Sequence, residues 1–208
     1  MTSPQVRSAH DRQRDSTRTA ILDSALTMVR EEPARTVSHE AIADRSGIAA
    51  RTVYRHFPTR GHLAGALWAR IRDETGTRWP TTEADIARSV RAQFAQFEKH
   101  AAFVRASIVT SATTDYVAHG SAEGRAAFQQ SLATVTRDLP PAESRRLVAI
   151  CVAMYSAPFW QMLRDRGKLS AEEAREAAAT AFEAVISAAK ARARVRKRKP
   201  TLHKETRP

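Results

Sequence analysis

Two arginines and a threonine stand close together in the segment Ala-Ala-Arg-Thr-Val-Tyr-Arg-His, residues 49–56. Guanidinium forks and short hydroxyl side chains are the groups that hydrogen-bond to base edges in the major groove of DNA. Donors and cations beside them hold phosphates in place. Ala49 and Ala50 leave room for close approach at the start of the segment. The segment 49–56 therefore supplies the residue types that contact with nucleic acid requires.

Residue patterns that would support catalysis are missing from the sequence. Its seven histidines form no pair with metal-ligand spacing, and no glycine-rich phosphate loop precedes a predicted helix. Cys151 stands alone, which excludes an internal disulfide and a cysteine-rich zinc site. It lies on an apolar helical stripe and is better interpreted as a small buried residue than as a nucleophile. We expect no catalytic residue, no metal site and no cofactor.

The positive charge of the chain is concentrated at one end. The formal net charge is +12, and residues 190–208 contribute +8 of it through nine basic residues and one acidic residue. The high isoelectric point is therefore poor support for DNA binding by the rest of the chain. We expect 190–208 to be a disordered basic tail that can add affinity for any DNA sequence.

Length and hydropathy restrict the class of protein. The chain has 208 residues and is 42% apolar, which suffices for one domain or two small ones with a real core. No apolar run approaches the about 18 residues that cross a bilayer. The first 20 residues lack the apolar segment of a secretory signal. A soluble cytoplasmic protein without membrane contact is the expected class.

Helical periodicity begins at about residue 16, after a polar segment, 1–15, that we expect to be a flexible arm. Apolar residues recur at spacings of three and four until Pro33, which ends the helix. Two short helical segments follow, and Gly47 lies between them, where a left-handed residue ends a helix. This layout, with Ser38 as the first cap, is that of a helix-turn-helix. Thr59 can cap a fourth helix.

The remainder of the chain is also predicted to be helical. Gly76, Trp79 and Pro80 mark a break, and no later segment alternates with the period of two that strands require. Pro158 should interrupt one long helix. We expect an all-α fold, with helices at about 82–99, 101–112, 123–138, 141–166 and 170–193 and a loop at 113–122.

Residues 36–63 resemble the DNA-binding domain of the tetracycline-repressor (TetR) family of bacterial regulators. The resemblance rests on one string of residues: Ile42-Ala43, Gly47-Ile48, Thr52-Val53-Tyr54, His56-Phe57, Arg60 and Leu63. With the preceding helix it covers roughly residues 16–70. It implies an N-terminal three-helix helix-turn-helix domain, residues 16–60, and a C-terminal helical domain for effector binding and dimerisation, residues 61–189.

The resemblance also implies roles for individual residues. The positions that face the major groove are Ala50, Arg51, Thr52 and Arg55, and those that contact the DNA backbone are Thr36, Ser38, Tyr54, His56 and Arg60. Each has a plainer interpretation. Tyr54 can be a packed residue, His56 a local hydrogen-bonding group, the two groove-facing arginines solvated surface, and Ser38 a helix cap alone.

For the C-terminal domain, the resemblance implies that the last two long helices form a four-helix dimer interface. The alternative is that their apolar stripes pack only within one chain. Candidate effector contacts are aromatic and polar residues spread over the domain: Phe94, Phe97, His100, Phe103, Tyr116, Phe128, Met154, Phe159, Trp160 and Gln161. Aromatic residues at helical spacing can equally be core.

The sequence therefore predicts a homodimeric transcriptional regulator, a repressor that a small-molecule effector releases from a palindromic DNA operator. Residues 61–189 carry almost no net charge and so do not select an anionic or a cationic effector. The alternatives are a regulator without ligand control or an activator, and a non-specific nucleic-acid binder that acts through its basic tail.

Overall fold

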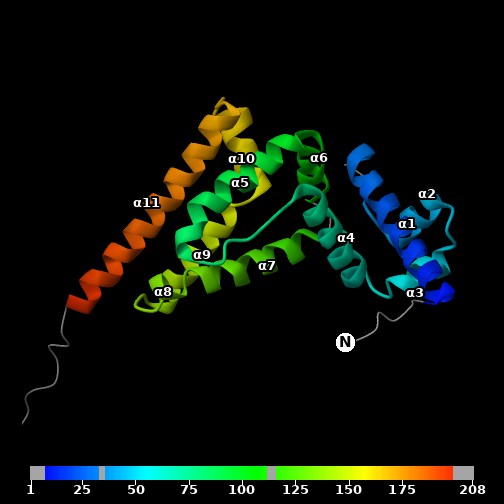
Figure 1. Cartoon of the computed structure of the whole chain (residues 1–208), viewed down its shortest axis with the longest axis horizontal. Helices are drawn as coiled ribbons and strands as arrows, with labels where there is room; N and C mark the ends of the chain where they lie inside the picture. Colours follow the sequence, from blue (N-terminus) through cyan, green and yellow to red (C-terminus); the bar gives the residue numbers. More distant parts are fainter. Residues whose placement is uncertain (1–7, 33–35, 112–115, 199–208) are drawn as a thin grey trace, which may run out of the picture. The chain divides into compact units, whose positions relative to one another are not determined.

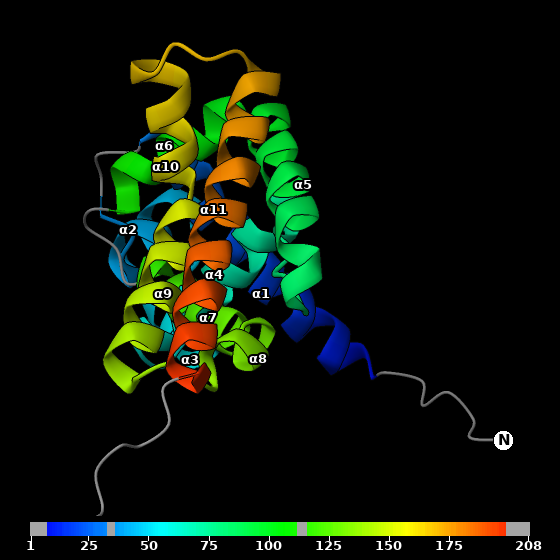
Figure 2. The ribbon, with the colours of Figure 1, turned by 90° about the vertical axis from the view of Figure 1, so that its left-hand side faces the viewer.

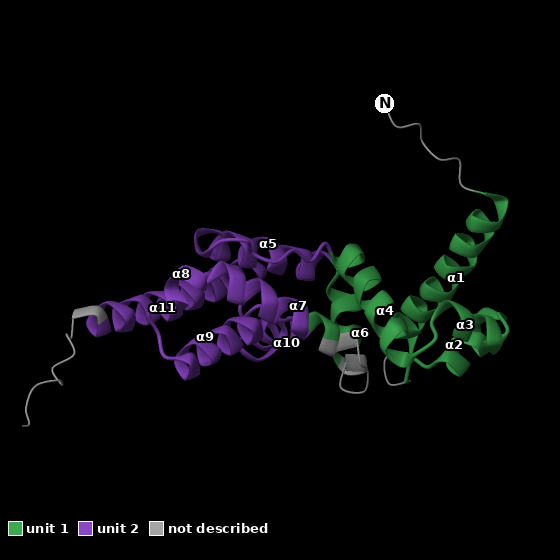
Figure 3. Ribbon diagram, turned by 90° about the horizontal axis from the view of Figure 1, so that it is seen from below, with its two compact units in different colours: residues 1–75, 100–120 green, residues 76–99, 121–208 purple. Residues whose placement is uncertain are grey.

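The fold was obtained as a computed structural model, which describes residues 8–32, 36–111 and 116–198. Within these ranges every regular element is a helix and no strand occurs (Figure 1). The predicted all-α class is confirmed, with a helix-turn-helix near the N-terminus and further helices after it. The described chain divides into two compact units, drawn in green and purple in Figure 3.

The first unit, unit 1, comprises residues 1–75 and 100–120 and contains the helix-turn-helix. Its core consists of apolar side chains from the first four helices and from Val37 and Phe57 beside them, with Phe103 added from a later helix. Ile21, Met28 and Val53 have no exposed surface. The helices of this unit are α1 (Ala9–Glu31), α2 (His39–Ser46), α3 (Ala50–His56), α4 (Arg60–Thr75) and α6 (Ala101–Ser111), together with the first residues of α7 (Tyr116–Ser131).

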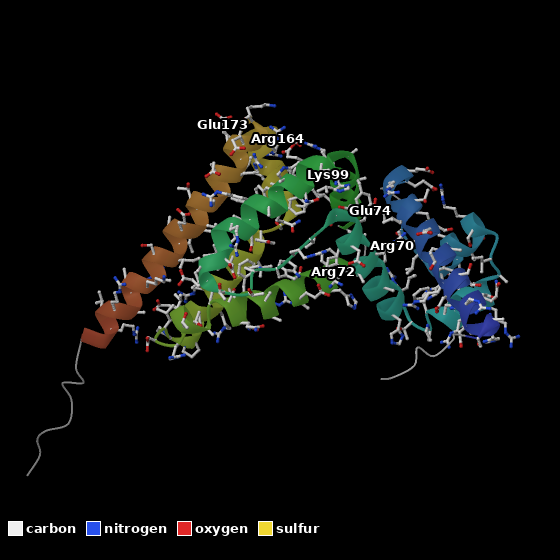
Figure 4. All side chains as sticks on the ribbon, viewed as in Figure 1. Arg70, Arg72, Glu74, Lys99, Arg164 and Glu173 are labelled. Atoms are coloured by element: carbon white, nitrogen blue, oxygen red, sulfur yellow. The ribbon has the colours of Figure 1, made fainter. Side chains whose placement is uncertain are left out.

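Ion pairs at the surface of unit 1 join α1 to α4. Arg70 lies 2.9 Å from Asp23, and Arg30 lies 2.5 Å from Glu74; Figure 4 labels the two partners on α4, Arg70 and Glu74. Such exposed pairs contribute little to the free energy of folding. The burial of the apolar faces dominates, and the ion pairs add to the preference for one register of α1 on α4.

The second unit, unit 2, comprises residues 76–99 and 121–208. Its longest helix, α11 (Ala171–Arg198), packs against both α5 (Ile86–Lys99) and α9 (Pro141–Met154), as Figure 2 shows. Alanines at the buried positions of α11 allow these close approaches. The shorter elements are a 3-10 turn η1 (Glu83–Asp85), α8 (Ala133–Thr136), α10 (Ala157–Gln161) and a π-helical turn η2 (Met162–Arg166).

Aromatic rings fill the centre of unit 2. Phe128 and Phe182 stack with their centroids 5.8 Å apart, and Tyr155 meets the Phe128 ring edge-on at 5.5 Å. The Tyr155 hydroxyl donates to the carbonyl oxygen of Arg78 at 2.5 Å. Because the ring and its hydroxyl are buried, the pKa of Tyr155 is raised. This side chain thus holds the segment before α5 against the core.

A second polar group in unit 2 fixes the turn that leads into α11. The carboxylate of Glu98 accepts hydrogen bonds from Trp160 Nε1 at 2.7 Å and from Arg164 Nε at 2.6 Å. Arg164, labelled in Figure 4, also donates to the carbonyl oxygen of Leu169. Because one carboxylate serves a buried indole and a guanidinium, these contacts tie α5, α10 and the η2 turn together.

Several helix limits differ from those expected. The first helix begins at Ala9, because Ser8 and Asp11 form a reciprocal capping box, so residues 9–15 of the expected arm are helical. The last helix continues to Arg198, where cationic side chains suit the negative end of the helix dipole. The expected basic tail is thus helical over residues 190–198, and 199–208 lie outside the described residues.

Two further limits have local causes. The interruption expected at Pro158 occurs just before it, because Ser156 caps a new helix whose first turn contains the proline. The helix α7 begins at Tyr116, within the expected loop 113–122, of which residues 113–115 lie outside the described residues.

Candidate nucleic-acid interface

The turn between α2 and α3 is formed by a capped start and a left-handed end. Ser38 Oγ accepts a hydrogen bond from the Ala41 amide at 3.1 Å, which fixes the start of α2. Gly47 ends this helix with φ of +68° and donates its N–H to the carbonyl oxygen of Ala43 at 3.0 Å. Glycine adopts this conformation without the steric cost of a side chain. The seven-residue helix α3 follows directly.

The helix α3 has one buried and one exposed face. Val53 is fully buried and Phe57, the cap residue just after the helix, is 1% exposed. Arg51 and Arg55 are exposed and lie one turn apart, and therefore on the same side of the helix. Thr52 beside them is half-buried. The exposed face thus presents two guanidinium forks from one short, rigid helix, which is what bidentate recognition of guanine requires.

Tyr54 is held by two residues of α2. Its hydroxyl donates to Glu40 Oε1 at 2.6 Å, and its ring stacks on His39 with centroids 4.2 Å apart and planes 2° from parallel. The hydrogen bond from Tyr54 lowers the pKa of Glu40 and raises the pKa of Tyr54. A phenol donates only one hydrogen. Tyr54 can therefore donate to a DNA phosphate only after its bond to Glu40 breaks.

His39 joins α2 to the end of α3. It is 3% exposed, and its Nε2 lies 2.7 Å from the carbonyl oxygen of Phe57. A carbonyl only accepts hydrogen bonds, so Nε2 carries the hydrogen. Sequence reasoning missed both His39 and Glu40. Their position one turn or less after the Ser38 cap placed them on α2, but nothing in their spacing indicated contact with Tyr54.

His56 is the last residue of α3, and it is half-buried. Its pKa is lowered by burial and then by the positive charges of Arg55, Arg14 and Arg18. The other residues expected at the DNA backbone lie around the same helices. Thr36 is exposed before α2, Ser38 is half-buried and occupied as a cap, and Arg60 is exposed at the first position of α4. Their contacts with DNA stay predictions.

The residues expected to contact an effector are distributed over both units. His100 and Phe103 belong to unit 1, where Phe103 packs into the core under Arg30 at 5.1 Å. In unit 2 most of the candidates lie in the packed core and are at most 9% exposed: Phe94, Phe97, Phe128, Met154 and Trp160. Phe159 and Gln161 are half-buried. The side chain of Tyr116 lies outside the described residues. Their role in effector binding stays a prediction.

A groove of about 290 Å³ lies on unit 2 between the start of α5 and α11. Phe182 and Ile186 form its apolar floor, and Lys190 Nζ lies 2.7 Å from Glu83 at its rim. None of the residues expected at an effector site lines it. No local pattern indicates this groove, because its walls come from segments far apart in the chain, such as Glu83 and Lys190.

Within 8–32, 36–111 and 116–198, no group of three or more histidine, cysteine or acidic side chains could hold a metal ion. In the same ranges no single helix is long and apolar enough to cross a membrane, although the pair Pro141–Met154 and Ala157–Arg166, bent by 59°, reaches that composition jointly.

The helices α2 and α3 lie within a match to a known protein family. Residues 21–67 match the family described as bacterial regulatory proteins, tetR family. Among solved structures, the chain is similar to a TetR transcriptional regulator from Rhodococcus sp. RHA1, with 22% sequence identity and a TM-score of 0.49. That match covers 83% of this chain and 98% of the other. No curated protein matches the chain.

Proposed function

We propose that this chain, whose residues 21–67 match the tetR family of bacterial regulatory proteins, is a homodimeric repressor. DNA-binding regulation of transcription follows from the family. The proposal adds that the dimer binds a palindromic operator and that a small molecule bound to unit 2 releases it. The observation that carries the proposal is the exposed face of α3, which presents Arg51 and Arg55 one turn apart on a helix anchored by Val53 and Phe57.

In this proposal α3 lies in the major groove and reads bases. Arg51 and Arg55 each make a bidentate contact with guanine, worth about 1–3 kcal/mol of discrimination between bases. Thr52 and the small side chain of Ala50 line the same approach. A small residue at the start of α3 lets the backbone come close to the DNA. Specificity thus depends chiefly on the two arginines.

Residues around α3 hold the phosphates. Arg60 and Thr36 are exposed and supply a cation and a hydroxyl, and the half-buried Ser38 adds a second hydroxyl. Tyr54 contributes its hydroxyl once it leaves Glu40, so Glu40 acts against binding through both its charge and its hydrogen bond. His56 gains a favourable partner for its protonated form when a phosphate approaches.

Dimerisation is supported by the outward faces of the last long helices in unit 2. The side of α11 opposite its core carries small uncharged residues in regular spacing: Thr180, Ala184, Ala188, Ala191 and Val195, all exposed. On α9, Ile150 is 45% exposed beside Ala149 and Ala153. Stripes of this kind let helices of two subunits approach closely. A dimer places two copies of α3 on half-sites about 34 Å apart.

Release by an effector requires a ligand that binds the DNA-free arrangement of the two α3 helices better than the bound one. We place this ligand in unit 2, with the aromatic and polar residues named above as its candidate contacts. The coupling is reciprocal, so operator DNA weakens effector binding by the same factor. Loss of the two arginine contacts in each half-site suffices to release the operator, given the discrimination energies above.

One observation favours the second candidate function, non-specific binding through the C-terminal end. Arg192, Arg194 and Arg196 are exposed on the last described turns of α11. A cationic helix end attracts any duplex, with affinity that falls steeply as salt rises. This function needs neither α3 nor a palindrome.

The proposal is tested by selecting binding sites from random duplex DNA with the purified chain at about 0.15 M salt. Enrichment of a two-fold symmetric site is the expected result. Replacing the exposed Arg192, Arg194 and Arg196 by glutamine removes charge but leaves the apolar stripe of α11 in place. It should weaken binding to all sequences alike and leave the enriched site unchanged. If no site is enriched and the triple substitution abolishes binding, the second candidate replaces the first.

The dimer is tested separately by sedimentation. Ala188→Arg places a charge in the exposed stripe of α11 and should convert a dimer to a monomer. Gln129→Arg adds the same side chain at an exposed position of α7 and should leave the dimer intact. A wild-type chain that sediments as a monomer at micromolar concentration contradicts the dimeric part of the proposal.

A further inference from the structure

The first turns of α1 present two arginines on the face that elsewhere forms the core. Arg14 and Arg18 continue the spacing of the buried Ile21, Ala25 and Met28 by steps of four and three residues. They therefore lie on the side of α1 that packs against the rest of unit 1. These turns precede residue 21, where the family match begins, and extend past α2 and α3 (Figure 3).

Arg18 joins these turns to the end of α3. Its Nη1 donates to the carbonyl oxygen of His56 at 3.3 Å, and its Cζ lies 4.3 Å from the centroid of the Phe57 ring. The first contact satisfies a carbonyl at the C-terminal end of a helix, and the second is a cation–π contact. Together they fix the first turns of α1 beside the last residues of α3.

Arg14 lies one turn before Arg18 and is exposed. No hydrogen bond or ion pair joins it to a residue in the described part of the chain. Asp11, three residues before it, accepts hydrogen bonds from the Ser8 hydroxyl at 2.8 Å and the Ser8 amide at 3.3 Å, and its pKa is lowered by these bonds and further by the charges of His10 and Arg14. The positive charge of Arg14 also reaches His56, whose pKa it lowers together with burial, Arg55 and Arg18.

Like charges from two helices thus meet at one end of α3. Three arginines repel one another there and disfavour the protonated form of His56, and a polyanion placed against them offsets that repulsion. The phosphates of duplex DNA carry one charge per about 1.7 Å of helix axis. Guanidinium groups bind phosphate oxygens in bidentate geometry. The arrangement therefore fits the sugar-phosphate backbone that flanks the bases read by α3.

We propose that Arg14 binds the DNA backbone, so that α1 adds a phosphate contact lying outside the helix-turn-helix. The inference rests on the proposed function, because it uses the same docking of α3. Arg18 is the positioning residue, since its contacts with His56 and Phe57 hold Arg14 in place. The contact carries no sequence information and strengthens binding to operator and random duplex alike.

The test compares Arg14→Ala with Arg12→Ala in the full-length chain. Arg12 stands on the same helix, about 200° around its axis from Arg14, so it controls for loss of one charge. Binding to a selected operator and to a random duplex is measured by fluorescence anisotropy from about 0.05 to 0.3 M salt. Arg14→Ala should weaken binding to both duplexes by about five- to ten-fold at the lowest salt concentration. It should also reduce the slope of log affinity against log salt concentration by about one per subunit.

Arg12→Ala should leave both affinities within about two-fold, and Arg14→Lys should restore the slope because it restores the charge. The proposal is overturned if Arg14→Ala keeps the wild-type slope, if the two alanine variants behave alike, or if only operator binding weakens. A wild-type chain that enriches no site contradicts the proposed function instead. The slope on random duplex then still decides the role of Arg14.

Discussion

The hydrogen bond between His39 and the end of α3 yields a quantitative prediction for His39→Phe. The substitution keeps an aromatic ring against Tyr54, where the centroids are 4.2 Å apart, and removes the donor that lies 2.7 Å from the carbonyl oxygen of Phe57. Because this site is buried, the carbonyl is left without a partner. An unsatisfied buried acceptor costs about 1–3 kcal/mol in the free energy of unfolding.

Thermal unfolding followed by circular dichroism measures this cost. For a chain of this size 1 kcal/mol corresponds to a change of about 2–4 °C in Tm. A loss of about 2 kcal/mol should therefore lower the Tm of His39→Phe by about 4–8 °C. His62→Phe makes the same exchange at an exposed position of α4 and should leave the Tm within about 2 °C.

The two variants separate the hydrogen bond from the effect of the new ring. If His39→Phe unfolds at the wild-type temperature, the His39 bond does not support the end of α3. The reasoning that α2 fixes the orientation of α3 would then be refuted. Equal destabilisation by both variants would attribute the loss to the added phenyl group instead.

Three further predictions concern packing, thiol reactivity and pH. Gly120→Ala would place a Cβ 2.8 Å from the Trp68 ring, so its free energy of unfolding should fall by about 1–3 kcal/mol in urea titrations, whereas Gly61→Ala, whose Cβ would meet Thr59 Oγ1 at an ordinary 3.7 Å, should not destabilise. Burial raises the pKa of Cys151 to about 12 and so disfavours the thiolate; iodoacetamide at pH 8.5 should label it only in urea, and rapid labelling of the native chain would contradict its burial. Burial and neighbouring arginines lower the pKa of His56, while a phosphate raises it, so binding takes up a proton; DNA affinity should rise from pH 8 to 6, and His56→Asn should abolish this rise.

The sequence predicts the elements of the helix-turn-helix well because local signals specify them. Ser38 caps α2, Gly47 takes the left-handed conformation, and Val53 with Phe57 forms the buried side of α3, all as the residue types imply. The all-α class follows from periodicity alone. These features depend on residues within a few positions of one another.

The contacts that set the chemistry of the interface were not predictable in the same way. Glu40 meets Tyr54 and Arg18 meets His56 through tertiary packing, across 14 and 38 residues of sequence. The aromatic residues of unit 2 show the same limit. Spacing placed Phe128 and Trp160 on helices, but only packing shows that both rings are fully buried.

The central claim is that α3 reads bases through its arginines, and parallel site selections test it most directly. Wild-type chain and Arg55→Ala are each used to select sites from the same random duplex pool, with Arg88→Ala as a control, whose exposed side chain lies on α5. The account predicts that Arg55→Ala loses preference at one base position in each half-site, placed symmetrically, with the rest of the site retained. Identical sites from all three proteins would contradict it.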